Sequence, residues 1–371
     1  MRKKITFFVP DISEARIIKR IKAFQILGAD IVICGFRRKR YSFSESEYNN
    51  VKLIILGETN EKKYLVRIPK LLFGIASIIM NLSVFRTCSC IYCINLDMLI
   101  LASILRIRYN AKFYYEVGDI LNTLVDKKLP NKVLRHLERF LLRQTNLLIL
   151  TSPAFYHQFY KKIQKIQCSW MLLENKLIPV AKPKRLIAIN KKAKKIKIVY
   201  HGVLRCPLSI KILAKVAGEL EEKCELHIHG FPLWVNKEIL SYYTKKNNNI
   251  FWHGEFKYPD GLKDILSDAD LLWLIDLSEN RNNAKWLLPN RLYDGIYYRV
   301  PMIALCNTET GNYINKYDIG WCFGGNILKE LYSLVSVITD KDISVKKSII
   351  AKIPSEVACS LDQHKRIYDS I

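Results

Sequence analysis

The chain has 371 residues and half of them are apolar, which is enough for two ordinary domains with substantial cores. Lysine and arginine number 59 and acidic residues 34, so the net charge at neutral pH is +25, with most of the excess in the first 180 residues. A field of this sign disfavours cationic partners and leaves nucleic acid, phosphorylated substrates and an anionic membrane face as candidates.

Ten cysteines are spread along the chain. No signal peptide precedes them, because the basic start leads into only a short apolar run before Pro10 and Asp11, so we expect reduced thiols in a cytoplasmic protein. The spacing of Cys88, Cys90 and Cys93 suggests a metal site, but zinc sites usually pair two ligand clusters and no second cluster stands out. We therefore expect these thiols to pack in a core, and we expect no metal.

An apolar stretch over residues 71–85 follows a basic flank that includes Arg67 and Lys70. The stretch falls short of the ~20 residues that a membrane-spanning helix needs. We therefore predict a buried or interfacial helix. A basic flank beside an apolar face is typical of peripheral proteins on an anionic leaflet.

Strands and helices alternate in the first half of the chain. Short apolar runs predict buried parallel strands, and apolar residues spaced three and four apart, such as Ile17, Ile21 and Phe24, predict helices. In chain order we expect strand 4–9, helix 14–27, strands 30–34, 51–56 and 90–94, helix 98–105, strand 111–117, helix 131–145 and strand 147–150. This order predicts a parallel sheet with helices on both faces.

Residues 178–195 interrupt the pattern, because Pro179, Pro183 and a crowd of lysines predict a basic linker. Beyond it we expect strand 196–200, helix 209–220, strands 225–229 and 249–253, helix 258–266, strand 269–275, helix 291–298 and strand 300–306. The predicted fold class is α/β, with two Rossmann-like, doubly wound domains over residues 1–177 and 196–371. The last helix is expected to pack back on the first domain.

Unusual residues follow three successive strands of the second domain. Gly202 and Arg205 follow the first strand, His229 and Gly230 end the next, and Gly254 follows the third. Ligands of open parallel sheets bind beyond the carboxyl ends of the strands. A glycine lets the backbone approach a diphosphate and an arginine can bind its oxygens, although a glycine also commonly turns a loop.

The segment from Asn283 to Asp294 has the strongest pattern. Pro289 and Asn290 mark the start of a helix, where unpaired N–H groups and the helix dipole favour an anion. Asp294 lies one turn inside this helix, and a carboxylate can accept two hydrogen bonds from a ribose diol. The alternative is an acidic residue that only stabilises the helix dipole.

The segment from Pro289 to Asp294 reads PNRLYD, and a strand that reads VPMIA begins at Val300. Together they resemble the donor site of GT-B glycosyltransferases, especially bacterial family-four-like enzymes of exopolysaccharide, capsule and O-antigen biosynthesis. Asp294 stands where those enzymes usually carry glutamate, and Arg299 where they carry glycine. Trp286 occupies the position of the first acid of the retaining members.

The resemblance extends from Ile5 to about Phe323. It implies two domains that face each other across a cleft, with the acceptor bound by the first and the nucleotide-sugar donor by the second. It also implies transfer of a sugar, such as a hexose, to a lipid-linked glycan acceptor in cell-surface polysaccharide biosynthesis. The donor-binding residues that follow from it and from the strand ends are Gly202, Arg205, His229, Gly230, Asn283, Asn290, Arg291 and Asp294.

Two segments of the first domain also agree with this family. The segment from Glu14 to Arg20 resembles the basic segment that follows the first strand, and the segment from Tyr114 to Asp119 resembles the acidic motif at a strand end. Asp119 or Glu116 is the candidate base for an acceptor hydroxyl. Arg16 is a candidate for binding the acceptor or its diphosphate.

In this interpretation, cationic side chains bind the phosphate groups of the donor and the acceptor. Arg205 and the helix that begins at Asn290 would hold the leaving diphosphate, so no metal and no other cofactor is expected. Arg37 and Arg38 open a basic run that is either a solvated loop or a contact for a lipid-linked diphosphate or for membrane headgroups. We expect a cytoplasmic protein that binds the anionic inner face of the plasma membrane.

Two other functions fit parts of these observations. An epimerase or hydrolase of nucleotide sugars would share the fold, but it would need more acidic and histidine side chains at the site than the pattern places there. A nucleic-acid-binding protein would explain the charge, but it would need a recognised module or a basic surface with aromatic residues. We therefore expect no nucleic acid partner.

Overall fold

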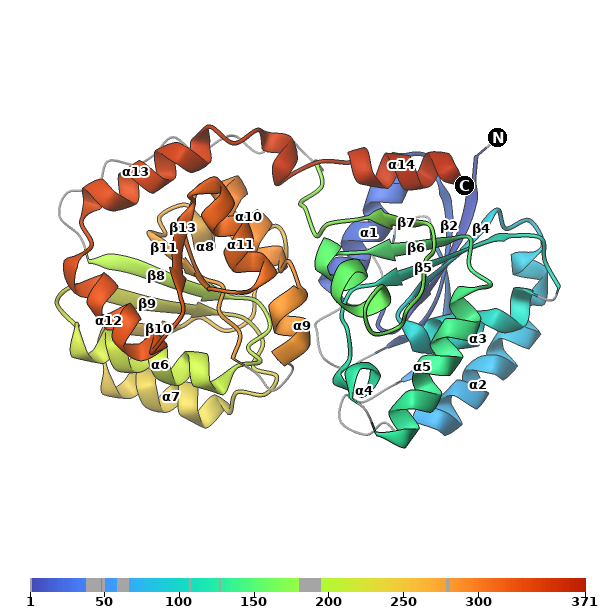
Figure 1. Cartoon of the computed structure of the whole chain (residues 1–371), viewed down its shortest axis with the longest axis horizontal. Helices are drawn as coiled ribbons and strands as arrows, with labels where there is room; N and C mark the ends of the chain where they lie inside the picture. The colour runs from blue at the N-terminus through green and yellow to red at the C-terminus, as the bar shows by residue number, and fades with distance from the viewer. Residues whose placement is uncertain are drawn as a thin grey trace. The chain divides into compact units, whose positions relative to one another are not determined.

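The computed structural model describes residues 2–37, 48, 51–58, 67–106, 108–126, 128–179, 195–277 and 281–371. The chain divides into two compact units, Met1–Glu174 with Leu361–Ile371 and Asn175–Ser360 (Figure 1). The first unit thus ends before the predicted boundary at residue 177, and it includes the end of the chain. Residues 180–194, which form most of the predicted linker, lie outside the described residues.

The first unit contains a seven-stranded sheet in the order β3-β2-β1-β4-β5-β6-β7, and all of its neighbours are parallel. The central strands are buried on both faces, which explains their continuous apolar sequences. The strands are β1 (Lys4–Val9), β2 (Asp30–Arg37), β3 (Lys52–Glu58), β4 (Cys90–Ile94), β5 (Lys112–Val117), β6 (Leu147–Leu150) and β7 (Trp170–Leu172).

Helices cover both faces of this sheet. Figure 1 shows α2, α3 and α5 grouped on one face and α1 and α14 on the other. The helices are α1 (Ala15–Ile26), α2 (Arg67–Met80), α3 (Leu96–Arg106), α4 (Asn122–Val125), α5 (Leu129–Leu142) and α14 (Asp362–Ser370), with the 3-10 helix η3 (Leu82–Phe85) and the π-helix η4 (Phe155–Tyr160).

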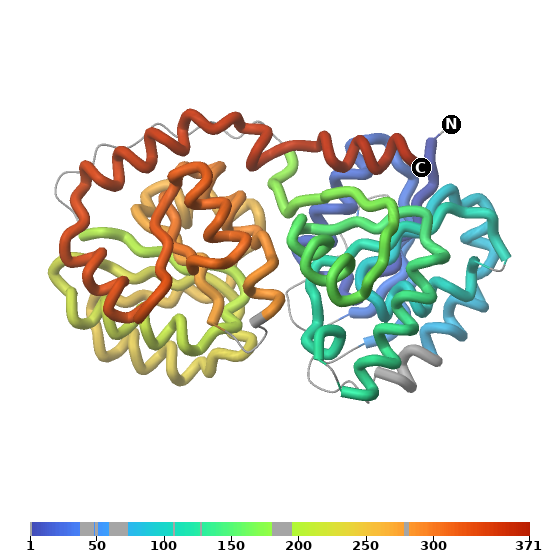
Figure 2. Tube along the Cα trace, in the orientation of Figure 1, coloured from blue at the N-terminus to red at the C-terminus, as the bar shows by residue number. Residues whose placement is uncertain are grey.

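The carboxy-terminal helix α14 is part of the first unit. Ile367 is fully buried in the same core as Phe24 of α1, and Lys3 Nζ donates to the carbonyl of Tyr368 at 2.7 Å. The red end of the tube in Figure 2 therefore lies beside the blue start of the chain.

The second unit contains a six-stranded parallel sheet in the order β10-β9-β8-β11-β12-β13. Its strands are β8 (Ile196–His201), β9 (Cys224–His229), β10 (Ile250–Trp252), β11 (Leu271–Trp273), β12 (Met302–Leu305) and β13 (Gly320–Phe323). Its helices are α6 (Pro207–Glu219), α7 (Lys237–Lys246), α8 (Leu262–Leu266), α9 (Arg281–Trp286), α10 (Asn290–Tyr298), α11 (Glu309–Tyr317), α12 (Ile327–Val337) and α13 (Asp340–Ala351), with the turn η5 (Ser355–Val357).

Two apolar cores lie on opposite faces of the second sheet. Ile198 of β8 packs with residues of α6 and α12, whereas its neighbour Val199 packs with residues of α8 and α10. This division follows from the alternation of side chains along a strand. The carboxyl ends of β8 and β9 carry His201 and His229.

The cysteines of β4 are core residues, as the sequence predicts. Cys90 and Cys93 are fully buried as free thiols, and burial raises the pKa of both. Cys88 is half-buried, and its thiol donates to the hydroxyl of Thr6 at 3.2 Å.

The apolar stretch 71–85 forms the larger part of α2 and the turn η3. Ile78 and Phe85 are buried, but Phe73 and Met80 are exposed on the outer side of α2. In the part of the chain that the structure describes, no helix is long and apolar enough to cross a bilayer.

Candidate functional site

Three glycine turns stack at the carboxyl ends of β8, β9 and β10. The N–H of Gly202 donates to the carbonyl of His229 at 2.9 Å, and the N–H of Gly230 donates to that of Gly254 at 2.6 Å. Gly230 has φ +136°, and an added Cβ would lie 1.7 Å from the Gly202 oxygen, so only glycine fits there. Gly202 has φ +107° with open space around its Cα. A ligand can therefore approach the backbone at Gly202.

The amino terminus of α10 provides positive charge beside these turns. The guanidinium of Arg291 stacks on the ring of Tyr200 at 4.8 Å, and no hydrogen-bond partner of its buried Nη1 is found among the described residues. The buried Nε of Arg205 also has no hydrogen-bond partner among the residues that the structure describes. The first turn of α10 has no acidic residue. The positive end of the helix dipole and two arginines make this region a candidate anion site.

Asp294 lies inside the second unit rather than on its surface. It is fully buried, and Tyr258 Oη donates to its Oδ1 at 3.1 Å. Its Oδ2 lies 3.7 Å from Nε2 of His201, whose pKa is lowered well below its usual range by burial and by Arg291. A neutral imidazole makes this contact polar rather than ionic. The ribose contact of Asp294 stays a prediction.

The other predicted donor-binding residues also belong to the second unit. Asn283 is in α9 and almost fully buried, and Asn290 is the half-buried first residue of α10. His229 ends β9 with its ring half-buried. The structure thus brings Gly202, Gly230 and Arg291 to one end of the second sheet.

Glu116 of β5 is a buried structural residue. Arg20 donates to its Oε1 at 3.2 Å and Tyr92 Oη donates to its Oε2 at 2.6 Å, and both carboxylate oxygens are shielded from solvent. A general base needs an oxygen that reaches the substrate. This environment argues against the predicted role of Glu116 as a base.

Asp119 and Arg16 lie near the end of β5 in the first unit. Arg16 is only 6% exposed and its guanidinium lies against Gly118, where an added Cβ would be 1.1 Å from Nη1. Burial lowers the pKa of Arg16, but the carboxylates of Glu14, Glu116 and Asp119 outweigh this and raise it. Asp119 itself is half-buried. It is therefore the more accessible of the two predicted acids.

Arg37 and Arg38 are the two other predicted arginines. Arg37 is the last residue of β2 and is exposed. Arg38 lies outside the described residues.

One group of side chains was missed by the sequence reasoning. His227 and His229 of β9 and His253 after β10 come together, with one ring nitrogen of each within 4.8 Å of the others. Burial and the neighbouring positive charges lower the pKa of all three. The available signal was the alternation HIH in one strand and a third histidine at the end of the next.

No family model matches the chain. The succinoglycan biosynthesis protein ExoL of Rhizobium meliloti (strain 1021) is 27% identical over 344 residues, which cover 91% of this chain and 85% of ExoL. Among solved structures, sucrose-phosphate synthase of Thermosynechococcus elongatus is similar with a TM-score of 0.73 and 11% identity, covering 100% of this chain and 99% of that one. HepE of Anabaena, in complex with UDP and glucose, has a TM-score of 0.72 and 11% identity over 100% and 99% of the two chains. The likeness confirms the predicted fold class, a GT-B fold built from two α/β units.

Proposed function

We propose that the chain is a glycosyltransferase that moves a sugar from a nucleotide-sugar donor to a glycan in polysaccharide biosynthesis. The carboxyl end of the second sheet carries this proposal, because the open turn at Gly202, the arginines Arg205 and Arg291 and the start of α10 provide a site for a diphosphate. The similarity to ExoL and to HepE, which has been solved with UDP-glucose, supports this class of reaction and donor.

In the proposed reaction the second unit binds the donor and the first unit binds the acceptor. The acceptor oxygen forms a bond to the anomeric carbon while the bond from that carbon to the donor phosphate breaks. Arg205, Arg291 and the N–H groups of α10 stabilise the departing diphosphate, so the step needs no metal. Asp119 takes the proton of the acceptor hydroxyl.

The acceptor in this proposal is a lipid-linked glycan on the anionic inner face of the plasma membrane. The outer side of α5 supports this, because four apolar side chains are exposed along it and basic residues flank them. These apolar residues are Leu129, Val133, Leu137 and Phe140. The exposed basic residues of the same segment are Lys128, Lys132 and Arg143. An apolar stripe with cationic edges suits an anionic leaflet.

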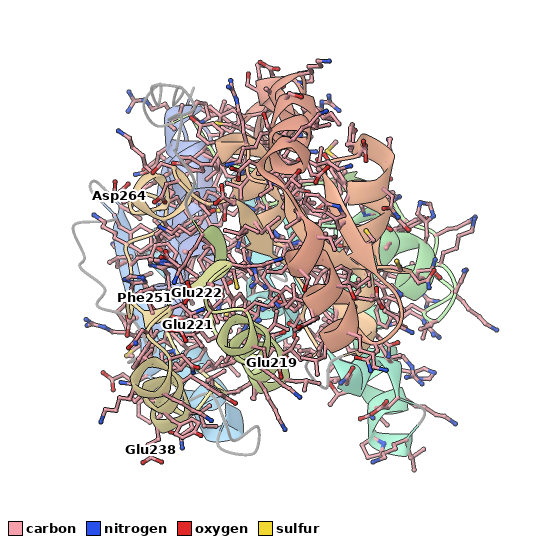
Figure 3. All side chains as sticks on the ribbon, turned by 90° about the vertical axis from the view of Figure 1, so that its left-hand side faces the viewer. Glu219, Glu221, Glu222, Glu238, Phe251 and Asp264 are labelled. Atoms are coloured by element: carbon pink, nitrogen blue, oxygen red, sulfur yellow. The ribbon has the colours of Figure 1, made fainter. Side chains whose placement is uncertain are left out.

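The predicted stretch 71–85 contributes to the same proposal through the exposed Phe73 and Met80 of α2. The second unit offers a different surface. Figure 3 labels Glu219, Glu221 and Glu222 at the end of α6, and an acidic region of this kind is repelled by anionic lipid. The first unit is therefore the one that we place on the membrane.

Nucleotide binding tests the proposal. We expect one member of a panel of UDP-, GDP- and TDP-sugars to bind in titration calorimetry. Arg291→Ala should weaken that binding by roughly 10- to 100-fold, because hydrogen bonds to charged groups contribute about 1.5–3 kcal/mol. Arg366→Ala is the matched control, since Arg366 is exposed on α14 in the other unit. If no nucleotide sugar binds, or if both variants bind like the wild type, the donor site is wrong.

A further inference from the structure

The pairing of β9 with β10 gathers three histidines on one face of the second sheet. Side chains two apart in a strand share a face, so His227 and His229 point the same way. β10 is the parallel edge strand, with Phe251 in register with His227. His253 follows β10, and its backbone N–H donates to the Ile228 carbonyl at 2.9 Å. This bond continues the pairing of β10 with β9 by one residue. Figure 3 labels Phe251 on this edge of the unit.

The three rings are close enough to share one ion. Nδ1 of His227 and Nε2 of His253 are 3.0 Å apart, and one nitrogen from each of the three rings lies within 4.8 Å of the others. Zinc–nitrogen bonds of about 2.0–2.1 Å in a tetrahedral site place the nitrogens roughly 3.3 Å from one another. The rings of His227 and His229 each stack on that of His253 with an interplanar angle of 8°, so metal binding requires the side chains to rotate until their lone pairs point at one ion.

A carboxylate orients the first of these rings. Nε2 of His227 lies 3.2 Å from Oε2 of Glu225, two residues earlier on the same face. A proton on Nε2 that is donated to Glu225 leaves the Nδ1 lone pair directed toward His253. Histidines that bind metals usually donate their other ring N–H to such a partner.

The surroundings of the cluster also suit a cation. Nε2 of His229 is buried, and no hydrogen-bond partner for it occurs in the described part of the chain. Lys197 is the nearby positive charge, and it is paired with Asp268 at 2.8 Å. A metal would give the buried nitrogen a partner that the described residues do not provide.

We propose that His227, His229 and His253 bind one divalent transition-metal ion, with zinc as the best fit to three imidazoles, and that Glu225 supports the site from outside. Three protein ligands leave a fourth position for water. The exposed edge of His253 gives that position access to solvent. The inference is independent of the proposed transfer reaction, which needs no metal.

The expected role of the ion is structural: it would stabilise the glycine turns of the donor site. His229 precedes Gly230 and His253 precedes Gly254, and these two glycines are joined by a backbone hydrogen bond of 2.6 Å. A metal bound to both histidines would tie the carboxyl ends of β9 and β10 together. It should therefore raise the melting temperature of the protein.

Zinc binding to the full chain without a histidine tag tests the proposal. After treatment with a chelator, the protein should bind one Zn²⁺ in competition with a fluorescent zinc chelator. His253→Gln should weaken binding by more than about 100-fold, and Glu225→Gln by about 10- to 100-fold, the usual effect of an outer partner. His136→Gln is the matched control, because His136 is an exposed histidine of α5. His253 is exposed, so its variant should fold, and its melting temperature without metal checks this.

Cobalt identifies the ligands. Co²⁺ bound by histidines gives visible d–d absorption without the near-ultraviolet band of a thiolate. Loss of this spectrum in His253→Gln, with no change in His136→Gln, supports the site. A thiolate band, no bound metal, or equal zinc affinity in the wild type and His253→Gln would overturn it. Nucleotide-sugar binding by the metal-free protein would leave the transferase proposal standing in each of these cases.

Discussion

Arg20 joins four segments of the first unit, and its removal should destabilise that unit strongly. The side chain is fully buried and donates to Glu116 Oε1 at 3.2 Å, to the carbonyl of Leu173 at 2.7 Å and to that of Glu174 at 3.1 Å. Nη1 of Arg20 also lies 3.3 Å from Nε2 of His364 in α14. Arg20→Met fills much of the same space but leaves a buried carboxylate and two carbonyls without this donor.

The expected loss is about 3–5 kcal/mol, the cost of removing one partner from a buried ion pair. Domains have total stabilities of only about 5–15 kcal/mol, so this is a large fraction. Urea unfolding followed by circular dichroism should show an early transition for the first unit. Arg366→Met, an exposed arginine of α14, is the control and should change stability by less than about 0.5 kcal/mol. If both variants unfold alike, the Arg20 network does not hold the first unit together.

Three further predictions concern the first unit. Asp119→Asn should lower kcat by on the order of 100-fold or more with donor affinity retained, whereas Glu116→Gln should keep kcat; the reverse in steady-state assays would exchange their roles. Burial raises the pKa of the Glu138 carboxyl above the ordinary 4.5, although its hydrogen bonds lower it. The protonated carboxyl therefore adds to the free energy of unfolding below about pH 4.5, and this contribution is lost as the pH rises through the folded pKa. Glu138→Gln should therefore lose less stability than the wild type as the pH rises above about 4.5 in urea titrations; equal pH profiles would contradict this. Phe140→Ser should reduce co-sedimentation with anionic vesicles, whereas Val337→Ser, an exposed residue of the second unit, should not; no salt-sensitive binding by the wild type would contradict the membrane proposal.

Much of the fold follows from local patterns in the sequence. The apolar run 4–9 became β1, and the helix expected over 14–27 is α1, because burial on both faces selects continuous apolar strands and the three-four spacing selects a helix. The helix expected over 258–266 is shorter, since α8 begins only at Leu262. Boundaries depend on turn geometry that composition does not specify.

The site was less predictable because it depends on partners that are distant in sequence. The pattern places Glu116 and Asp119 at one strand end, but it does not show that Arg20, 96 residues away from Glu116, covers the first of them. Similarly, the His227–His253 contact depends on the register of two strands separated by α7. Register is set by the packed sheet rather than by either strand alone.

Glu116 in the first unit and Asp294 in the second have similar surroundings. Glu116 is held by Tyr92 and an arginine, and Asp294 is held by Tyr258 beside a neutral histidine. In each case a buried carboxylate accepts a tyrosine hydroxyl, and a more accessible polar residue lies three positions away in the chain: Asp119 after the first and Arg291 before the second. A buried carboxylate that accepts such hydrogen bonds costs little only while its partners stay in place, so it fixes the backbone around it. Loss of Asp294 would then weaken donor binding by displacing α10, and the affinity for inorganic diphosphate should fall together with that for the nucleotide.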